Sequence, residues 1–402
     1  MLIVCHYFEP SSETGAIRST RLARFLLHKG LRPGVVTAAS EFYGARVHLD
    51  GAVRREVDVF EVPRGALLRR TPVGGPAAAA LRNAALVRAY AAAIERAVRT
   101  SDPFDLLYLC GHPFWYFPLA RHFRLRHGLR YVLDFADVFY MGRTRYRMGQ
   151  RSGLRQAFDR AAEAWAVQGA SLVVHTTDLQ TRMYRERYET KPARDFVTVR
   201  WGYDAEALAG LDVPPKPRDD VFRIAIFGKF ASYCAEDSRQ LARAVARLHV
   251  GRRVQVVHLG APEPELEAAF RREGLLACFQ SAGMQPYAAG MRELPSADCL
   301  VLNAISDVSL PAKVYDYIAL NRPIVAFAAP ESALGQLLGR FSGAFLAATA
   351  EQALDVFTRI ADRRLAELQA GLDTAEFSQQ YQFEKLLRAL RSLVPERSPW
   401  DD

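Results

Sequence analysis

A loop followed by a helical pattern at residues 306–320 holds side chains suited to bind a phosphorylated ligand. Polar residues from Ser306 lead to Pro311, which is typical of a first helical turn, where free backbone N–H groups and the helix dipole attract phosphate. Lys313 adds a positive charge, and Asp316, one turn later, has a carboxylate suited to ribose hydroxyls. A surface helix with an ordinary cap would have the same sequence, so the residues alone leave both interpretations open.

Two polar side chains in the first half of the chain follow strand-like segments and are suited to act on a hydroxyl. Asp137 ends the segment 133–137, and His112 follows the strand-like segment before it. Because ligand sites of α/β sheets lie at the carboxyl ends of strands, we expect Asp137 to handle an acceptor hydroxyl, with His112 in the same site. The competing interpretations are a helix N-cap for Asp137 and loop packing beside Pro113 for His112.

Alternating apolar runs and helical patterns must position these residues. Short apolar runs bounded by loops indicate buried parallel strands at 2–5, 34–37, 106–110, 131–135, 172–175, 222–227, 254–260, 299–303 and 323–327. Helical spacing of apolar residues covers 17–29, 77–99, 154–168, 236–248 and 377–393. This alternation predicts an α/β protein with doubly wound parallel sheets.

Three prolines and three acidic residues at 211–221 interrupt the pattern and indicate a linker. A chain of 402 residues also exceeds the usual size of a single core. We therefore expect two Rossmann-like domains, at 1–210 and 220–376, facing a cleft that is the default ligand site.

The net charge of +9 is unevenly distributed. Residues 1–200 carry a balance of +13 and the remainder −4. A basic first half suits an anionic partner, and the run from Arg143 to Arg155 is suited to lipid headgroups or to the pyrophosphate of an acceptor. A solvated Arg-rich loop is the competing interpretation. No nucleic-acid-binding motif accompanies the charge, so we expect no nucleic-acid partner.

Cysteine usage and hydropathy indicate the compartment. The five cysteines form no CxxC pair, which argues against a disulfide framework and against a structural zinc site. The sequence has no signal-peptide pattern at residues 1–20 and no apolar run long enough to span a membrane. We expect a cytoplasmic protein, with peripheral contact at the inner face of the membrane as a hypothesis.

The segment 310–326 resembles the sugar-nucleotide signature of glycosyltransferase family four and its GT-B relatives. Those enzymes share a Pro-x-Lys-x-x-acidic-aromatic run, which matches Pro311, Lys313 and Asp316. The more familiar version has two glutamates eight positions apart; Asp316 matches the second, and Val308 stands at the position of the first. Other segments resemble the family in the same order along nearly the whole chain, at 5–26, 199–204, 227–229, 281–287 and in the terminal helix.

The resemblance implies roles for residues in both domains. In the N-terminal domain, to which the helix at 377–402 crosses back, it implies that Glu13, Thr14, Gly15 and Arg18 lie at the acceptor site. In the C-terminal domain it implies a sugar-nucleotide site made of these residues: Gly228, Lys229, Gly283, Met284, Leu310, Pro311, Ala312, Lys313 and Asp316. Our candidate catalytic residues are Lys229 and Lys313, which would stabilise the leaving diphosphate, and Asp137.

The activity that the resemblance implies is transfer of a sugar from a nucleoside-diphosphate sugar to an acceptor hydroxyl, with retention of configuration. Two lysines and helix N-termini suffice to stabilise the diphosphate, and the sequence lacks the Asp-x-Asp triplet of metal-dependent GT-A enzymes. We therefore expect a hexosyltransferase-type enzyme without metal or cofactor and with a lipid-linked or small-molecule acceptor. Bacterial enzymes of this kind commonly build cell-surface polysaccharide, lipopolysaccharide or other glycoconjugates.

Two alternatives remain, and a third is disfavoured. The missing first glutamate, and the missing second cation after Lys229, fit a catalytically silent sugar-nucleotide-binding subunit. A GT-B sugar-nucleotide epimerase would share the donor site but needs several acid–base side chains around the sugar. A dinucleotide oxidoreductase is disfavoured because no Gly-x-Gly-x-x-Gly fingerprint follows any predicted strand.

Overall fold

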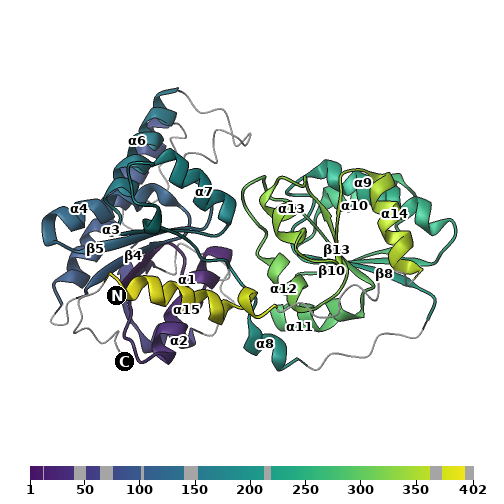
Figure 1. Cartoon of the computed structure of the whole chain (residues 1–402), viewed down its shortest axis with the longest axis horizontal. Coiled ribbons are helices and arrows are strands. Elements are labelled where there is room, and N and C mark those ends of the chain that lie inside the picture. The colour runs from purple at the N-terminus through teal and green to yellow at the C-terminus, as the bar shows by residue number, and fades with distance from the viewer. Residues whose placement is uncertain are drawn as a thin grey trace. The chain divides into compact units, whose positions relative to one another are not determined.

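The chain forms two compact units, Met1–Val199 with Phe383–Asp402, and Arg200–Gln382. The computed structural model describes residues 1–11, 13–39, 51–63, 76–100, 104–139, 153–211, 219–362 and 374–393, without the side chains of Thr14, 76–83 and 154–155. Each unit is a parallel β-sheet covered by helices (Figure 1). This is the α/β architecture that the sequence pattern predicts.

The first unit contains a seven-stranded sheet in the order β3-β2-β1-β4-β5-β6-β7, with all neighbours parallel. Its strands are β1 (Leu2–Cys5), β2 (Gly34–Ala38), β3 (Asp58–Val62), β4 (Leu106–Cys110), β5 (Arg130–Phe135), β6 (Leu172–His175) and β7 (Phe196–Thr198). Its helices include α1 (Thr14–His28), α2 (Ala52–Glu56), α3 (Pro76–Val98), α4 (Pro118–His127), α6 (Gly153–Gly169) and α7 (Asp178–Arg187).

The second unit contains a six-stranded parallel sheet in the order β10-β9-β8-β11-β12-β13. Its strands are β8 (Phe222–Phe227), β9 (Val254–Leu259), β10 (Phe279–Gly283), β11 (Cys299–Asn303), β12 (Ile324–Phe327) and β13 (Ala344–Ala347). Its helices include α8 (Ala205–Ala209), α9 (Ala235–His249), α10 (Pro264–Arg272), α11 (Tyr287–Glu293), α12 (Lys313–Ala319), α13 (Ala333–Leu338) and α14 (Ala350–Ala361). The chain then enters α15 (Gln379–Arg391).

Burial on both faces explains why the predicted strands appear as continuous apolar runs. In β1, Leu2 and Val4 pack in one cluster with apolar residues of α3 and α4. Ile3 and Cys5 face the other way and pack with α1 and with the apolar face of α15. The terminal helix therefore lies against the first unit, as the sequence resemblance implies. No helix in the described parts of the chain is long and apolar enough to cross a membrane.

Four strands that the sequence pattern does not predict, β3, β7, β10 and β13, are the edge strands of the two sheets. An edge strand has a neighbour on one side only, so it needs no continuous apolar run. Strand β3 has the sequence Asp-Val-Phe-Glu-Val and β10 has Phe-Gln-Ser-Ala-Gly, and both are largely exposed or half-buried. Residues 281–283, which begin one of the segments that resemble the family, are the end of strand β10.

The strand order reverses between β1 and β4 in the first unit and between β8 and β11 in the second. Ligands of open α/β sheets bind outside the carboxyl ends of the strands at such a reversal. The loops after Cys5 and Cys110, and those after Phe227 and Asn303, are therefore where a functional site is expected in each unit.

Candidate functional site

The loop that leaves the carboxyl end of β8 is held by side chains from other elements. Gly228 has a φ of +71°, which favours glycine, and its carbonyl accepts a hydrogen bond from His258 Nε2 at 2.9 Å. The carbonyl of Lys229 accepts one from Lys313 Nζ at 2.6 Å. Because Lys313 begins α12, segments 84 residues apart in sequence meet here. The fold thus brings the two predicted lysines together at the strand reversal.

Glu263, which no sequence pattern singles out, binds the next part of the same loop. Its carboxylate accepts hydrogen bonds from the backbone N–H groups of Phe230 at 2.7 Å, Ala231 at 2.9 Å and Ser232 at 2.9 Å. Burial alone would raise the pKa of Glu263, but the hydrogen bonds from these residues lower it overall. The carboxylate occupies a cradle of N–H groups of the kind that binds anions, so these amides fix the shape of the loop.

Lys313 lies in an unusual environment for a lysine. Its side chain is buried, with 8% of the residue exposed, and its Nζ lies 5.9 Å from the centre of the Tyr233 ring. Burial lowers the pKa of Lys313 to about 7, and the negative charge of Glu263 opposes this shift. With this pKa, the Lys313 amine is near its titration midpoint at neutral pH. A bound anion would raise the pKa of Lys313 and so favour its charged form.

Asp316 lies three residues further along α12, and its carboxylate is held in place. The residue is 9% exposed, and its Oδ1 accepts a hydrogen bond from the Tyr287 hydroxyl at 2.7 Å. The ring of Tyr287 meets the ring of Phe227 at 6.5 Å in an edge-to-face arrangement. Phe227 is the last residue of β8, so Asp316 and the glycine–lysine turn belong to one connected group of residues.

The start of α12 differs from the surface helix that was the competing interpretation of this segment. The helix runs from Lys313 rather than Pro311, and its N-cap Ala312 makes no side-chain capping bond. All six residues from Lys313 to Ile318 are buried. Leu310, which precedes the helix, is also buried, with 6% exposed. An ordinary capped helix on the surface therefore does not describe α12.

Two residues of the predicted sugar-nucleotide site, Gly283 and Met284, lie at the end of β10. Gly283 has a φ of +72°, and its carbonyl accepts a hydrogen bond from the Gly260 N–H at 3.0 Å. Met284 is 73% exposed. The backbone of this turn is thus fixed, whereas the Met284 side chain is open to solvent.

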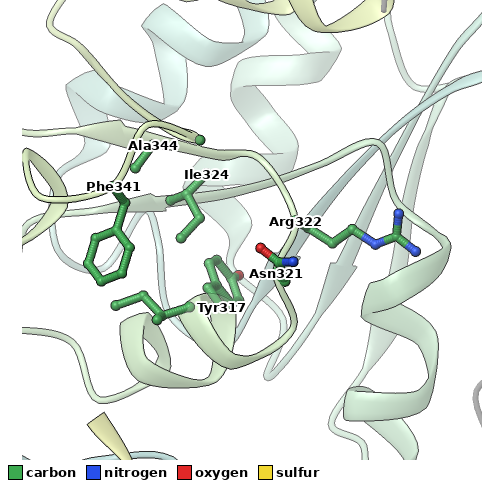
Figure 2. A pocket seen from close by; sticks show the side chains of 8 residues that line it. Tyr317, Asn321, Arg322, Ile324, Phe341 and Ala344 are labelled. Carbon is green, nitrogen blue, oxygen red and sulfur yellow. The ribbon is translucent and has the colours of Figure 1, made fainter. Parts of the chain in front are cut away.

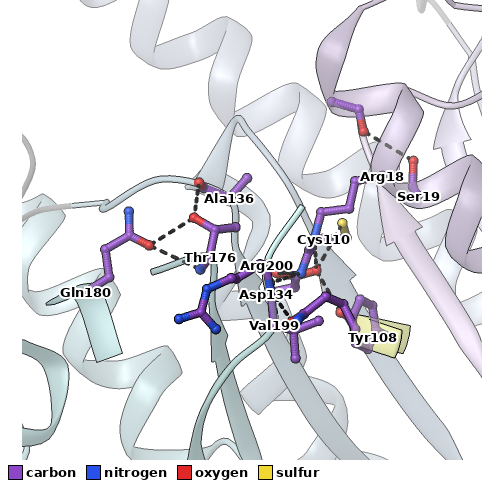
Figure 3. Close-up of polar contacts among 12 residues, drawn as sticks. Arg18, Ser19, Tyr108, Cys110, Asp134, Ala136, Thr176, Gln180, Val199 and Arg200 are labelled. Atoms are coloured by element: carbon purple, nitrogen blue, oxygen red, sulfur yellow. Dashed lines mark hydrogen bonds and ion pairs between the residues drawn. The ribbon is translucent and has the colours of Figure 1, made fainter. Parts of the chain in front are cut away.

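Arg18, predicted at the acceptor site, is instead in the interior of the first unit. It is 2% exposed, and its Nε lies 2.7 Å from Asp134 Oδ2. The same carboxylate accepts a hydrogen bond from the Tyr108 hydroxyl at 2.7 Å, and Arg18 also donates to the Val199 carbonyl at 3.0 Å. Figure 3 shows these groups converging around Asp134. The charge of Arg18 is used inside the fold, where it joins α1, β5 and the end of β7.

The other predicted acceptor residues lie at carboxyl ends of strands in the same unit. Glu13 is the N-cap position of α1, and Thr14 and Gly15 are its first residues. His112 follows β4, and its ring packs edge to face on Phe114 at 5.2 Å. Asp137 follows β5 and is exposed in a bend.

His6, at the end of β1, is a further polar residue that the sequence pattern does not single out. Its Nδ1 lies 2.9 Å from the Tyr90 hydroxyl, and its ring meets that of Trp115 at 6.3 Å. Burial, followed by the charge of His112, lowers the pKa of His6 to about 4. The signal that could have found it is its position directly after the first strand, at the strand reversal.

A small cavity lies beside the last turn of α12. Its volume is about 20 Å³, which suffices for one water molecule, and its lining includes Tyr317, Ile324 and Phe341. Figure 2 shows Arg322 pointing away from these side chains. Within the described residues, no group of three or more His, Cys, Asp or Glu side chains is placed to hold a metal ion.

Solved structures match nearly the whole chain, although no protein-family model and no curated protein sequence matches it. HepE from Anabaena, solved with UDP and glucose, has a TM-score of 0.66 at 14% identity and covers 98% of this chain and 100% of its own. Sucrose-phosphate synthase from Thermosynechococcus elongatus has a TM-score of 0.66 at 13% identity and covers 98% and 99%. The chain has the GT-B fold.

The GT-B fold is not confined to transferases. The UDP-GlcNAc 2-epimerase from Neisseria meningitidis, solved with UDP-GlcNAc, has a TM-score of 0.62 at 11% identity and covers 98% of this chain and 100% of its own. The site residues must therefore decide between activities. In this GT-B chain the predicted donor residues lie in the second unit and the predicted acceptor residues in the first.

Proposed function

We propose that the chain is a glycosyltransferase that moves a sugar from a nucleoside-diphosphate sugar to an acceptor hydroxyl. The observation that carries the proposal is the meeting of Gly228, Lys229, Lys313 and Asp316 at the strand reversal of a GT-B chain. HepE, with the same fold, was solved with UDP and glucose, so UDP-glucose is the first donor to test.

The diphosphate of the donor would lie against the Gly228 turn and the two lysines. The ammonium group of Lys313 is buried and therefore poorly hydrated. The negative charge of a bound diphosphate would compensate for the lost hydration. The ribose would lie at Asp316, and the base at the turn around Gly283 and Met284. These residues follow β8, lie in the helix after β11 and surround the end of β10, all within the parallel sheet of the second unit.

The reaction breaks the bond between the anomeric carbon and a diphosphate oxygen. Positive charge develops on the sugar ring, and negative charge develops on the leaving diphosphate, where Lys229 and Lys313 would stabilise it. The acceptor oxygen then bonds to the anomeric carbon and loses its proton. We assign Asp137 to the acceptor hydroxyl, as the carboxylate that takes this proton. We propose retention of configuration, a hexosyl donor and no requirement for a metal ion.

The test is turnover of sugar nucleotides with a mixture of acceptor lipids and sugars. We expect release of the nucleoside diphosphate that depends on acceptor, persists in EDTA and falls at least 100-fold in Lys313→Met. Proton NMR of the product reports the anomeric configuration. Lys29→Met is the matched control, because Lys29 is a half-exposed lysine of the first unit paired with Glu384. Release that is equal in Lys313→Met and in the wild type would contradict the proposal.

The same experiment separates the two alternatives. An epimerase would convert UDP-GlcNAc into its C2 epimer with no acceptor present. A silent subunit would bind a nucleotide but give neither product. Glu263 and His258, two acid–base side chains beside the candidate donor residues, are committed to the backbone of the loop, which favours transfer.

We also propose that the acceptor is carried at an anionic membrane surface, as in synthesis of cell-surface polysaccharide or lipopolysaccharide. The run from Arg143 to Arg155 lies almost wholly outside the described residues, but the neighbouring helices support the idea. Helix α4 contains three arginines, two histidines and no acidic residue. In α6, Asp159 and Glu163 are buried, whereas Phe158 and Trp165 are 65% and 44% exposed.

The two helices form one surface. They pack against each other, and the guanidinium of Arg121 in α4 lies 4.0 Å from the centre of the Trp165 ring in α6. A face that combines exposed aromatic rings with arginines is typical of binding to an anionic lipid interface. We call the exposed residues of α4 and α6 the α4–α6 surface.

Flotation with phosphatidylglycerol vesicles at low salt tests the α4–α6 surface. We expect the wild type to float and the double variant Phe158→Ser and Trp165→Ser to remain in the pellet. Val250→Ser, which removes a 90% exposed apolar residue of the second unit, is the control and should float normally. Equal flotation of the double variant, or no flotation of the wild type, would contradict the membrane assignment and leave transfer to soluble acceptors to be measured separately.

A further inference from the structure

Tyr287 contacts each part of the proposed donor site. It begins α11, directly after the turn at 283–286 that we assign to the base. Its hydroxyl donates to Asp316, which we assign to the ribose, and its ring meets Phe227, which precedes the Gly228 turn. One side chain thus connects the predicted base, ribose and diphosphate positions.

The hydrogen bond from Tyr287 fixes the direction of the Asp316 carboxylate. At 2.7 Å, an O–H group donating to a carboxylate is a charge-assisted bond, and such bonds are stronger than those between neutral groups. Both partners are shielded from solvent, because Asp316 is 9% exposed and Tyr287 is half-buried. Low local polarity strengthens the bond further. A carboxylate has about four acceptor positions, so this bond leaves capacity for additional donors.

The ring of Tyr287 is positioned independently of its hydroxyl. It packs against Phe227, and the α11 backbone approaches the same Phe227 ring at Gly290, where a Cβ would come within 2.6 Å of a ring carbon. Because α11 lies this close to β8, replacing Tyr287 by Phe removes the O–H group and retains the packing.

We propose that Tyr287 is a positioning residue that directs the Asp316 carboxylate to a ribose hydroxyl, so that the donor is a ribonucleotide rather than a deoxyribonucleotide. This inference rests on the proposed function, because it requires a nucleoside diphosphate at the site. A hydroxyl that meets a pre-oriented carboxylate contributes more to binding than one that must first order it. Loss of the Tyr287 hydroxyl therefore weakens ribonucleotides selectively.

The test compares dissociation constants for matched nucleotides by calorimetry. The probes are UDP, GDP, CDP and ADP, and for the one that binds most tightly, its 2′-deoxy and 3′-deoxy forms. We expect wild type to bind the ribonucleotide at least 10-fold more tightly than one of the deoxy forms. In Tyr287→Phe, the ribonucleotide should weaken about 10-fold while the deoxy form changes less than 3-fold, so the ratio falls toward 1.

This ratio separates positioning from a structural role. A purely structural defect would weaken the ribonucleotide and the deoxy form equally and leave the ratio unchanged, which would overturn the inference. Asp316→Asn should abolish the ratio as well, and Tyr381→Phe, at a 46% exposed tyrosine of α15, should preserve it.

The remaining outcomes distinguish the inference from the proposed function. If wild type binds the ribonucleotide and both deoxy forms equally, the inference fails and the nucleotide site stands. If Asp316→Asn abolishes the ratio and Tyr287→Phe does not, Asp316 contacts the ribose without help from Tyr287. If wild type binds dTDP but none of the four ribonucleotides, the inference fails and the proposed function stands. If it binds neither dTDP nor any of the four, the proposed function and the inference both fail.

Discussion

The Lys313 side chain is buried, and its Nζ donates a hydrogen bond to the backbone carbonyl of Lys229. Its pKa is lowered to about 7, against 10.5 for an ordinary lysine. Such a group is costly to keep in a fold unless an anion joins it, because burial disfavours its charged form. Its environment therefore supports the proposed role of Lys313 in binding an anion. The same reasoning links pH to donor binding.

Donor affinity should decrease as the pH rises above about 7. The free protein then loses the Lys313 charge, whereas the diphosphate of a sugar nucleotide, which does not titrate in this range, binds the charged form. Binding must take up a proton, so affinity should fall about 10-fold per pH unit between pH 8 and 9 and change little near pH 6. Calorimetry with UDP-glucose from pH 6 to 9 measures this, and Lys313→Met should show no such slope. A pH-independent wild-type affinity would contradict the role assigned to Lys313.

His175 predicts a second pH dependence, this one of stability. It is fully buried between the rings of Phe135 and Tyr184, and neither ring nitrogen has a hydrogen-bond partner within the described structure. Burial lowers the pKa of His175 to about 3, whereas the unfolded chain has a value near 6.5. The unfolded state therefore binds the extra proton below pH 6.5, and this residue makes stability fall with falling pH, by up to about 1.4 kcal/mol per unit.

The variant His175→Phe should remove that dependence. A phenyl ring keeps the stacking on Phe135 and Tyr184 and leaves no unpaired ring nitrogen. Urea unfolding should show a gain in stability that is larger at pH 5 than at pH 7.5. A loss of stability at both pH values would mean that the imidazole has a favourable partner.

At this scale, a continuous motif singles out candidate residues, whereas residues that act across elements have no such signal. Lys313 and Asp316 share a short segment that resembles a sugar-nucleotide signature, and the fold brings Lys313 to the predicted Lys229. Glu263 and Tyr287 reach their partners only through packing of separate elements, which a local pattern does not contain. Arg18 matched the expected segment, but its buried partner Asp134 lies 116 residues away.

At the scale of elements, the two chain segments that connect the units are paired with each other. Within the second unit, Tyr203 N–H donates to the Phe377 carbonyl at 2.9 Å, and Gln379 N–H donates to the Tyr203 carbonyl at 2.8 Å. Gly202 makes this approach possible. It has a φ of +68°, and a Cβ there would lie 2.7 Å from the backbone nitrogen of Gln379.

The substitution Gly202→Ala should therefore destabilise the protein by about 2 kcal/mol or more. The strain has two sources, an unfavourable left-handed backbone and a contact with another backbone that does not yield easily. Gly251→Ala is the matched control, because nothing lies within 4 Å of a Cβ there and its φ is not positive. Thermal unfolding of both variants measures the difference, and equal melting temperatures would contradict the account of this crossing.

The predictability of an element followed its place in its sheet. The inner strands of each sheet were predictable, because burial on both faces requires a continuous apolar run, as in Leu-Leu-Tyr-Leu-Cys of β4. The edge strands β3, β7, β10 and β13 were not, because one exposed side relaxes that requirement. Helix α12 was predicted in place, but the residues alone left open whether it lies on the surface, and the structure shows that it is buried.

At the scale of the whole molecule, the sequence predicted two α/β units and the GT-B fold that solved structures share. Strand–helix alternation and the linker composition suffice for the two units, because they depend on local patterns, whereas the GT-B prediction came from the resemblance at 310–326 and the other matching segments. The choice of sugar, base and acceptor depends on a few side chains at strand ends, which differ among proteins of this fold.

We propose above all that the strand reversal of the second unit binds a nucleoside-diphosphate sugar through Lys313. A thermal-shift screen with UDP-, GDP-, dTDP- and ADP-sugars, on wild type, Lys313→Met and the control Lys29→Met, tests it most directly. We predict that one nucleotide at about 100 times its dissociation constant stabilises the wild type and the control by about 2.7 kcal/mol and Lys313→Met far less. Equal shifts in all three proteins, or no shift with any sugar nucleotide, would contradict the account.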